Sequence, residues 1–174
     1  RRQRPQQFED WPHALPASHL PRGRVVTGVE DLGPTVQHLC DVAGTPSGDA
    51  CDWLVDDIVD LGRRFANLMS VRYLRLRLDV VSNNACQKFH VDAVRARLIC
   101  TFRGHGTQYG IATDSAGPAR VFQVPTGAPI LLRGALWPED PPTGLLHRSP
   151  PIEGSGETRL VLVLDPIQDA EVAG

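Results

Sequence analysis

The sequence is poor in lysine: Lys88 is its only lysine, and all its other Lys or Arg residues are arginines. These arginines are spread along the chain and alternate with apolar residues, so they do not form the basic patch that binds nucleic acid. The formal net charge at pH 7 is only -2. We therefore expect no nucleic-acid partner.

Long apolar runs are also missing. No stretch approaches the roughly eighteen apolar residues of a membrane-spanning helix. The basic segment at residues 1–7 is not followed by the apolar region of a signal peptide. The sequence therefore predicts no membrane partner and a cytoplasmic location.

Cysteine is scarce and widely spaced. Cys40, Cys51, Cys86 and Cys100 show neither a CxxC motif nor a disulfide framework. A chain of 174 residues, 41% of them hydrophobic, is long enough to bury one well-filled core without disulfides. We expect reduced thiols in one structural domain, and the sequence indicates no oligomeric state.

Three segments of this domain differ in pattern. The patterns predict an N-terminal arm and helices in residues 1–70, a β core in residues 71–165 and a C-terminal tail in residues 166–174. Within the first segment, residues 1–24 hold four prolines and show no periodicity. This predicts an extended arm that either wraps the body of the domain or is partly disordered.

Two helices are predicted before residue 70. The first covers residues 34–42, with Pro34 in its first turn and Gly44 as its stop signal. The second begins after Asp49 as N-cap, because apolar residues then recur at helical spacing. The residues of this stripe are Leu54, Ile58, Leu61, Phe65 and Leu68. The stripe should pack on a sheet.

After residue 70 the period changes from helical to two. Between residues 71 and 80, leucines alternate with charged residues, the pattern of a strand with one buried face. The predicted strands are 71–80, 87–91, 94–103, 107–112, 119–124, 128–133, 144–148 and 158–165. They predict a mostly β, α+β fold: a jelly roll of about eight strands, with two N-terminal helices packed on one sheet.

Two histidines and one carboxylate in this frame have the composition of a metal site. His90 and Asp92 are two residues apart, so at the end of an extended segment both side chains point to the same face. His147 lies in a later predicted strand that can return beside them. Two imidazoles and one carboxylate leave coordination positions open and suit Fe(II), with Zn, Mn, Ni or Co as alternatives.

Each element of this site also has an ordinary explanation. An HxD tripeptide occurs by chance, and a lone histidine such as His147 is more often a hydrogen-bonded structural residue. The metal site is predicted from the combination, because the HxD falls at a strand end and His147 near the start of the next-to-last strand.

Three further polar residues could hold an organic acid. Arg159 lies in an apolar run that predicts a strand buried on both faces, where a cation needs a partner. It lies either at a solvated strand entrance or beside a carboxylate that its planar guanidinium binds. Arg97 and Thr101 alternate with apolar residues, so they either line the same cavity or face solvent.

Cys86 offers a different kind of site, because it lies four residues before His90. A thiolate beside two imidazoles and a carboxylate would close the coordination sphere, as in structural zinc sites. The alternative is a small buried or loop cysteine without a ligand role.

The order HxD, distal His and later Arg resembles that of the Fe(II)- and 2-oxoglutarate-dependent dioxygenases, whose double-stranded β-helix is a jelly-roll variant. The resemblance covers roughly residues 71–165. It implies that His90, Asp92 and His147 are catalytic iron ligands, and that Arg159 binds the distal carboxylate of 2-oxoglutarate as cosubstrate. One departure is Val161, which stands where that family often has a serine.

A closer resemblance is to a bacterial domain-of-unknown-function family numbered 1826. It is carried by residues 88–92, 95–98, 144–154 and 156–160, and it spans most of the chain. The resemblance implies no reaction, but genes of this family are linked to zinc homeostasis. Two functions are therefore predicted. One is a non-haem Fe(II) oxygenase acting on an unidentified small molecule or side chain. The other is a non-catalytic metal-binding jelly-roll protein with a link to zinc homeostasis.

Overall fold

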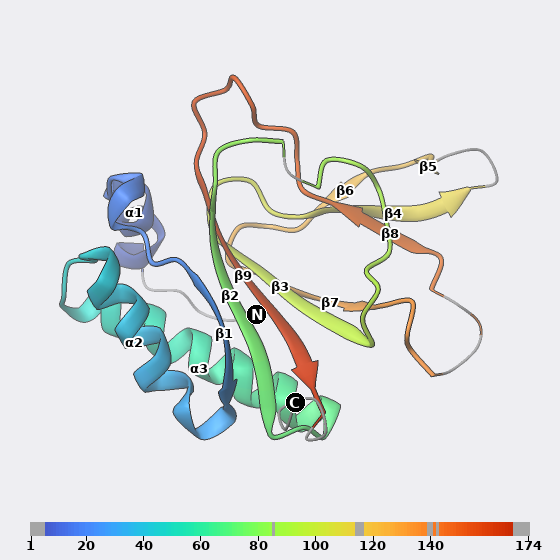
Figure 1. Ribbon diagram of the computed structural model, residues 1–174. Helices are drawn as coiled ribbons and strands as arrows, with labels where there is room; N and C mark the ends of the chain where they lie inside the picture. Colours follow the sequence, from blue (N-terminus) through green and yellow to red (C-terminus); the bar gives the residue numbers. More distant parts are fainter. Residues whose placement is uncertain (1–5, 85, 114–116, 139–140, 142, 169–174) are drawn as a thin grey trace.

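The computed structural model describes residues 6–84, 86–113, 117–138, 141 and 143–168. Its helices lie against one face of a large antiparallel sheet, and a smaller sheet lies over the other face (Figure 1). The architecture is mostly β with a few helices, which confirms that part of the expectation.

The large sheet has five strands in the order β1-β2-β9-β3-β7, and all neighbouring strands are antiparallel. The strands are β1 (Gly23–Gly28), β2 (Tyr73–Val81), β9 (Arg159–Ile167), β3 (Ala96–Arg103) and β7 (Pro129–Arg133). β9 lies at the centre and is buried along nearly its whole length. This burial agrees with its almost continuous apolar sequence.

The smaller sheet is built around β4 (Gln108–Thr113). Its partners are β5 (Gly117–Pro118), β6 (Phe122–Gln123) and β8 (Leu145–Arg148). The chain passes repeatedly between the two sheets: β3 and β7 belong to the large one, β4 and β8 to the small one, and β9 returns to the large one.

The strand predicted at residues 87–91 is not formed. Only His90 pairs there, as a single antiparallel bridge to His147. The backbone turns at Cys86, where φ is 56°, and bends again at residues 93–95 before β3 begins. These turns leave no room for a continuous ladder.

The helical layer has more elements than the two helices expected. The helices are α1 (Gln6–Ala14), α2 (Leu32–Ala43) and α3 (Asp49–Met69), with two short 3-10 helices, η1 (Ala17–His19) and η2 (Val29–Asp31). α2 ends at Gly44, which adopts the left-handed conformation of a C-cap. The N-cap of α3 is Gly48 and not Asp49. Asp49 lies in the first turn, where its negative charge interacts favourably with the helix dipole.

The prediction of an extended arm in residues 1–24 is wrong for residues 6–24. These residues fold into α1, η1 and the start of β1. Phe8 is 2% exposed, and its ring centroid lies 3.7 Å from that of Trp53 on α3. Arg103 on β3 donates a hydrogen bond to the carbonyl of Leu15 (2.7 Å). These long-range contacts order a segment in which the sequence shows no periodicity.

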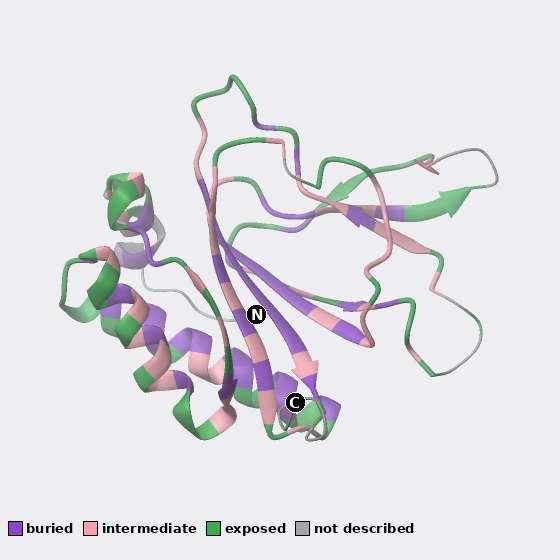
Figure 2. Cartoon of the chain, in the orientation of Figure 1, coloured by how far each residue is buried: buried purple, intermediate pink, exposed green. Residues whose placement is uncertain are grey.

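One face of α3 packs on the large sheet, where Figure 2 shows buried residues along the helix. The predicted stripe is correct for four residues that are at most 5% exposed: Leu54, Ile58, Leu61 and Phe65. Leu68, by contrast, is 65% exposed. The buried face of α3 also includes Val55, Gly62 and Ala66, so its centre lies to one side of the predicted stripe. Leu68 falls on the opposite edge of the stripe, and Met69 takes the inward place.

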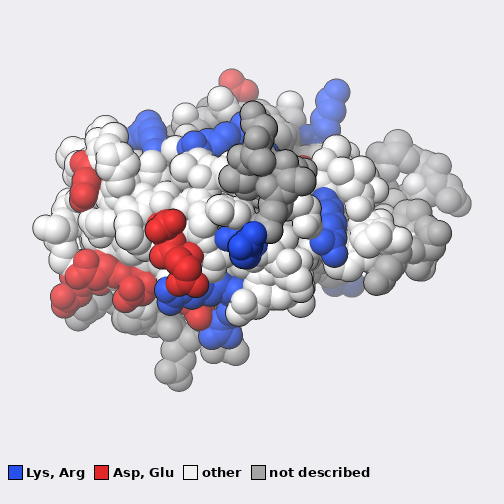
Figure 3. All heavy atoms as spheres, turned by 60° about the horizontal axis from the view of Figure 1, so that its bottom comes forward, with Lys and Arg blue, Asp and Glu red and all other residues white. Residues whose placement is uncertain are grey.

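Acidic side chains gather on the part of the surface where the helices lie (Figure 3). Asp52 and Asp56 on α3 are exposed, and Asp60 pairs with Arg64 one turn later. The outer side of this helix is therefore polar. No helix among the described residues is both long and apolar enough to cross a membrane.

Two apolar clusters hold the layers together. The larger lies between the helices and the outer face of the large sheet. The smaller lies between the two sheets and contains Ile99, Leu132, Val161 and Val163. It fills only part of that space, because charged side chains take neighbouring positions on the inner face.

The two leucines of α3 that differ in burial give a test of this packing. We expect Leu54→Ala to lower the free energy of unfolding by about 2–5 kcal/mol, because it removes buried methylene groups and leaves a cavity. Leu68→Ala, on the same helix, should change it by less than about 0.5 kcal/mol. Urea unfolding followed by circular dichroism measures both, and equal losses would contradict the placement of α3.

Candidate metal centre

Two histidines meet across a backbone bridge. His90 lies in the loop between β2 and β3, and His147 lies in β8. The N–H of each donates to the carbonyl of the other, both at 3.0 Å. Side chains of directly opposed residues lie on the same face of a sheet, and the two ring centroids are 4.5 Å apart. His147 is buried and His90 is partly exposed.

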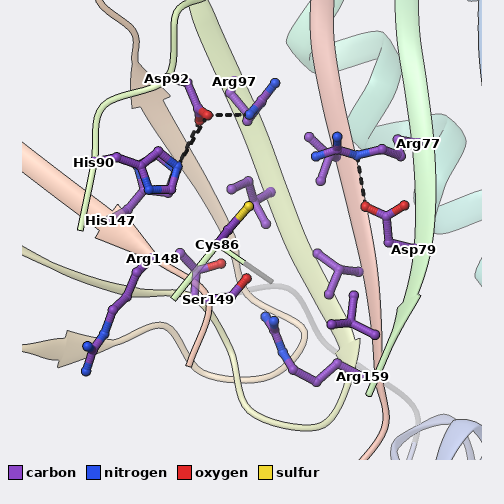
Figure 4. Close-up of a pocket in the computed structure, with 15 residues that line it drawn as sticks. Arg77, Asp79, Cys86, His90, Asp92, Arg97, His147, Arg148, Ser149 and Arg159 are labelled. Carbon is purple, nitrogen blue, oxygen red and sulfur yellow. Dashed lines mark hydrogen bonds and ion pairs between the residues drawn. The ribbon is translucent and has the colours of Figure 1, made fainter. Parts of the chain in front are cut away.

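Asp92 completes this cluster from the same loop as His90. Its Oδ2 lies 3.0 Å from Nε2 of His147, and its Oδ1 lies 3.5 Å from Nε2 of His90 (Figure 4). One possible ligand atom from each of the three residues lies within 4.8 Å of the others. Within the described part of the chain, this is the only such group of three or more His, Cys, Asp or Glu side chains. The structure thus brings together the three residues predicted as ligands.

The donor chemistry of the three residues fits a cation. Nδ1 of His90 lies 2.8 Å from the carbonyl oxygen of Lys88, which can only accept, so Nδ1 carries the proton and Nε2 presents a lone pair. Oδ2 of Asp92 is buried and receives no well-oriented hydrogen bond, although His147 is close. Lone pairs that face one another in a partly buried site repel unless a cation lies between them.

The charge of Asp92 is also suited to a metal. Burial alone would raise the pKa of Asp92, but the adjacent His147 imidazole and the Arg97 guanidinium lower it below its usual value. A carboxylate must be deprotonated to bind a metal ion. Asp92 is therefore in its ligating form at neutral pH.

The segment after β7 holds the backbone of the Asp92 loop. The N–H of Ala135 donates to the carbonyl of Asp92 (2.9 Å). At Gly134, a Cβ would lie 1.9 Å from the carbonyl oxygen of Val94, so only glycine permits this approach. Sequence reasoning missed the contact between this segment and the Asp92 loop. Gly134 was the one residue in the sequence that could have indicated it.

Arg97 contacts two carboxylates. Its Nε and Nη2 donate to the two oxygens of Asp165 (2.7 and 2.8 Å), and its Nη1 donates to Oδ1 of Asp92 (2.5 Å). Of the two placements expected for Arg97 and Thr101, cavity lining and solvent, Arg97 has the first, whereas Thr101 is buried and is not among the residues that line the cavity. Contact of Arg97 with an organic acid stays a prediction. Sequence reasoning missed Asp165. It could have been found because Asp165 lies an even number of residues after Arg159 in the same strand, so both side chains point to the same face of the sheet.

Arg159 is a buried cation whose hydrogen-bond partners, within the described part of the chain, are neutral. It is 1% exposed, which excludes the solvated strand entrance. Its Nε donates to the carbonyl of His105 (2.7 Å) and its Nη2 to Oγ1 of Thr101 (3.4 Å). Burial lowers its pKa to about 10, against the opposing effect of Glu157, so it remains charged at neutral pH. No carboxylate of the described residues lies within 4.0 Å of it.

One cavity of about 110 Å³ connects the histidine cluster with Arg159. Figure 4 shows His90, His147 and Asp92 on one side of it and the Arg159 guanidinium on the other. Pockets for drug-sized ligands measure roughly 300–1,000 Å³. The cavity therefore suits a small molecule that reaches both groups.

Cys86 lines the same cavity but does not belong to the ligand cluster. Its side chain is exposed, and its carbonyl accepts a hydrogen bond from the N–H of Ser149 (3.0 Å). This bond holds the loop against the end of β8. The closed site with a thiolate ligand is not formed in this structure.

Comparison with known proteins identifies a family. Residues 1–165 match the model of the family described as "Protein of unknown function (DUF1826)". No curated protein matches the chain.

Likeness to solved structures is slight. The chain is 10% identical, with a TM-score of 0.33, to Fe(II) HppE in complex with substrate. It is 10% identical (TM-score 0.34) to hydroxypropylphosphonic acid epoxidase from S. wedmorenis, and 15% identical (TM-score 0.34) to Peruvianin-I, a cysteine peptidase from Thevetia peruviana latex. Each match covers 53% of this chain and 45%, 42% and 50% of the other chain, respectively. At such TM-scores the likeness identifies neither a fold nor a reaction.

Removal of single ligands tests the metal centre. We expect His90→Ala and His147→Ala each to abolish stoichiometric binding of Fe(II) or Zn(II), because two ligands cannot hold the ion. His38→Ala, which changes an exposed histidine on α2, should bind as the wild type does. Elemental analysis after gel filtration measures the metal content, and equal content in all three variants would contradict the site.

Proposed function

Because the chain belongs to the family described as protein of unknown function (DUF1826), its reaction has to be argued from its site, and we propose that it is a non-haem Fe(II) oxygenase. The observation that carries the proposal is a small cavity with two imidazoles and a carboxylate on one side. On its other side lies a buried arginine, whose hydrogen-bond partners among the described residues are neutral oxygens. In this proposal His90, Asp92 and His147 are the catalytic metal ligands.

The ligand set supports iron. Three protein ligands on one side of an octahedral ion leave the opposite positions open, the arrangement of non-haem Fe(II) oxygenases, and bound Fe(II) would supply oxygen activation there. The protein's own part is to orient what binds. The bridge between His90 and His147 fixes both rings, and the hydrogen bond from His90 to Lys88 sets its tautomer.

The strand arrangement supports the jelly-roll proposal. In the large sheet, the neighbours β2-β9-β3-β7 come from the two ends and the middle of residues 71–165. The strands between them, together with the His90 bridge, form the opposing sheet. We propose that residues 71–165 are the metal-binding core. Residues 1–70 add β1 to its large sheet and pack their helices on the outer face of that sheet, and the tail predicted at residues 166–174 belongs to the same domain, although β9 itself runs to Ile167.

Arg159 is the proposed partner of an organic acid cosubstrate, and 2-oxoglutarate is the candidate. A guanidinium binds a carboxylate through two parallel N–H groups, and burial strengthens that pair. The hydroxyl missing at Val161 has a substitute, since Thr101 is the register partner of Val161 and its Oγ1 already contacts Arg159. The oxidised substrate is a small molecule or a side chain.

The cosubstrate test separates this proposal from metal binding alone. Under anaerobic conditions the Fe(II) protein should develop a metal-to-ligand charge-transfer band when 2-oxoglutarate is added. Arg159→Lys should keep the metal and weaken 2-oxoglutarate binding about 10- to 100-fold, because the charge survives and the paired N–H groups are lost. Absence of both the band and any calorimetric heat with iron-loaded wild type would refute the oxygenase proposal.

A second candidate is a non-catalytic zinc-binding protein. It is favoured by Cys86, a soft ligand that lines the same cavity close to His90. Protein purified without added metal would then contain zinc, and 2-oxoglutarate would not bind to it. Iron in that protein would favour the oxygenase.

A further inference from the structure

We propose that Arg97 and Asp165 are positioning residues that make Asp92 bind its metal ion through one oxygen only. The inference rests on the metal centre of the proposed function. It concerns how many coordination positions remain open, a property that the identity of the three ligands does not fix.

The contacts of Arg97 differ for the two carboxylates. Two of its N–H groups face Asp165, at 2.7 and 2.8 Å, and only Nη1 reaches Asp92. Asp165 thus occupies the Nε–Nη2 side of the guanidinium, one of its two sides that bind a carboxylate at two points. Only Nη1 contacts Asp92, at one oxygen, so Arg97 holds Oδ1 and leaves Oδ2 beside the histidines.

The two oxygens of Asp92 consequently have different surroundings. Oδ1 accepts the hydrogen bond from Arg97, whereas Oδ2 is buried, receives no well-oriented hydrogen bond and faces His147. Oδ2 is therefore the free ligand atom. A carboxylate whose other oxygen is held in this way binds a metal in monodentate form, so three protein ligands fill half of an octahedral sphere.

Burial makes this arrangement firm. The side chains of Arg97, Asp92 and Asp165 are 15%, 13% and 8% exposed, so solvent screens their charges little. Burial alone would lower the pKa of Arg97, but Asp165 and Asp92 raise it above its ordinary value, and the guanidinium stays charged. Asp165 balances the charge of Arg97, which leaves the negative charge of Asp92 for the metal.

The experiment uses Mn(II) as the probe, because water-proton relaxation counts the waters on the bound ion. Arg97→Gln should lower Mn(II) affinity about 10- to 100-fold, as loss of an outer-shell partner does. It should also reduce the number of bound waters by about one, since the released Oδ1 takes a position. Asp165→Asn should lower the affinity as well, because Arg97 is then free to form a two-point pair with Asp92.

Two further variants keep the test decisive. The double variant Arg97→Gln/Asp165→Asn removes both charges of this pair together, so neither member is left buried without the other, as happens in the single variants. It should show the same loss of a water. The matched control is Arg77→Gln. Arg77 lines the same cavity, but it pairs with Asp79 at 2.9 Å and does not belong to the ligand cluster, so Mn(II) affinity and the number of bound waters should stay unchanged.

The outcomes separate the two proposals. Wild-type protein that binds no Mn(II), Fe(II) or Zn(II) overturns the metal centre and this inference with it. If the wild type binds Mn(II), and the number of bound waters is unchanged in both Arg97→Gln and the double variant, only the positioning role is overturned. This holds whatever happens to the affinity. A loss of water in Arg77→Gln as large as in Arg97→Gln would also overturn it.

Discussion

The backbone bridge between His90 and His147 is the contact on which the candidate site depends. It is the only β pairing described for the loop between β2 and β3, and it fixes the register of that loop against β8. A shift by one residue would turn His90 to the opposite face, because side chains alternate along an extended chain. The same bridge carries Asp92, two residues later, to the side of the histidines.

The buried charged residues on the inner face of the large sheet lower the stability of the fold. Arg97, Asp165 and Arg159 lie there beside a small apolar cluster, although well-packed apolar residues in place of buried charges are often neutral or stabilising. Arg97 and Asp165 satisfy each other, but the partners of Arg159 are neutral oxygens. This imbalance is the physical reason to expect an anionic ligand in the cavity.

The helices contribute to the site through β9. On its outer face, Leu160, Leu162 and Leu164 are fully buried in the cluster that includes α3. On its inner face, the same strand carries Arg159 and Asp165. The helical layer therefore holds rigid the strand that places both charged groups, as a preorganised site requires.

Local pattern was enough to predict most strands, two helices and the three ligand candidates, because alternation and helical spacing are properties of consecutive residues. It failed where long-range contacts decide the structure. The segment of α1 is ordered by aromatic packing on α3, and residues 87–91 turn instead of forming a ladder.

The sequence by itself determined that His90 and Asp92 share a face and that the strand of Arg159 is buried on both sides. Only the tertiary structure decided which strands are neighbours. The pairing of β3 with β9 brings Arg97 to Asp165 across 68 residues of chain, and thereby gives Arg97 its contact with Asp92. No local pattern encodes such a contact, because strand pairing depends on how the whole chain packs its apolar faces.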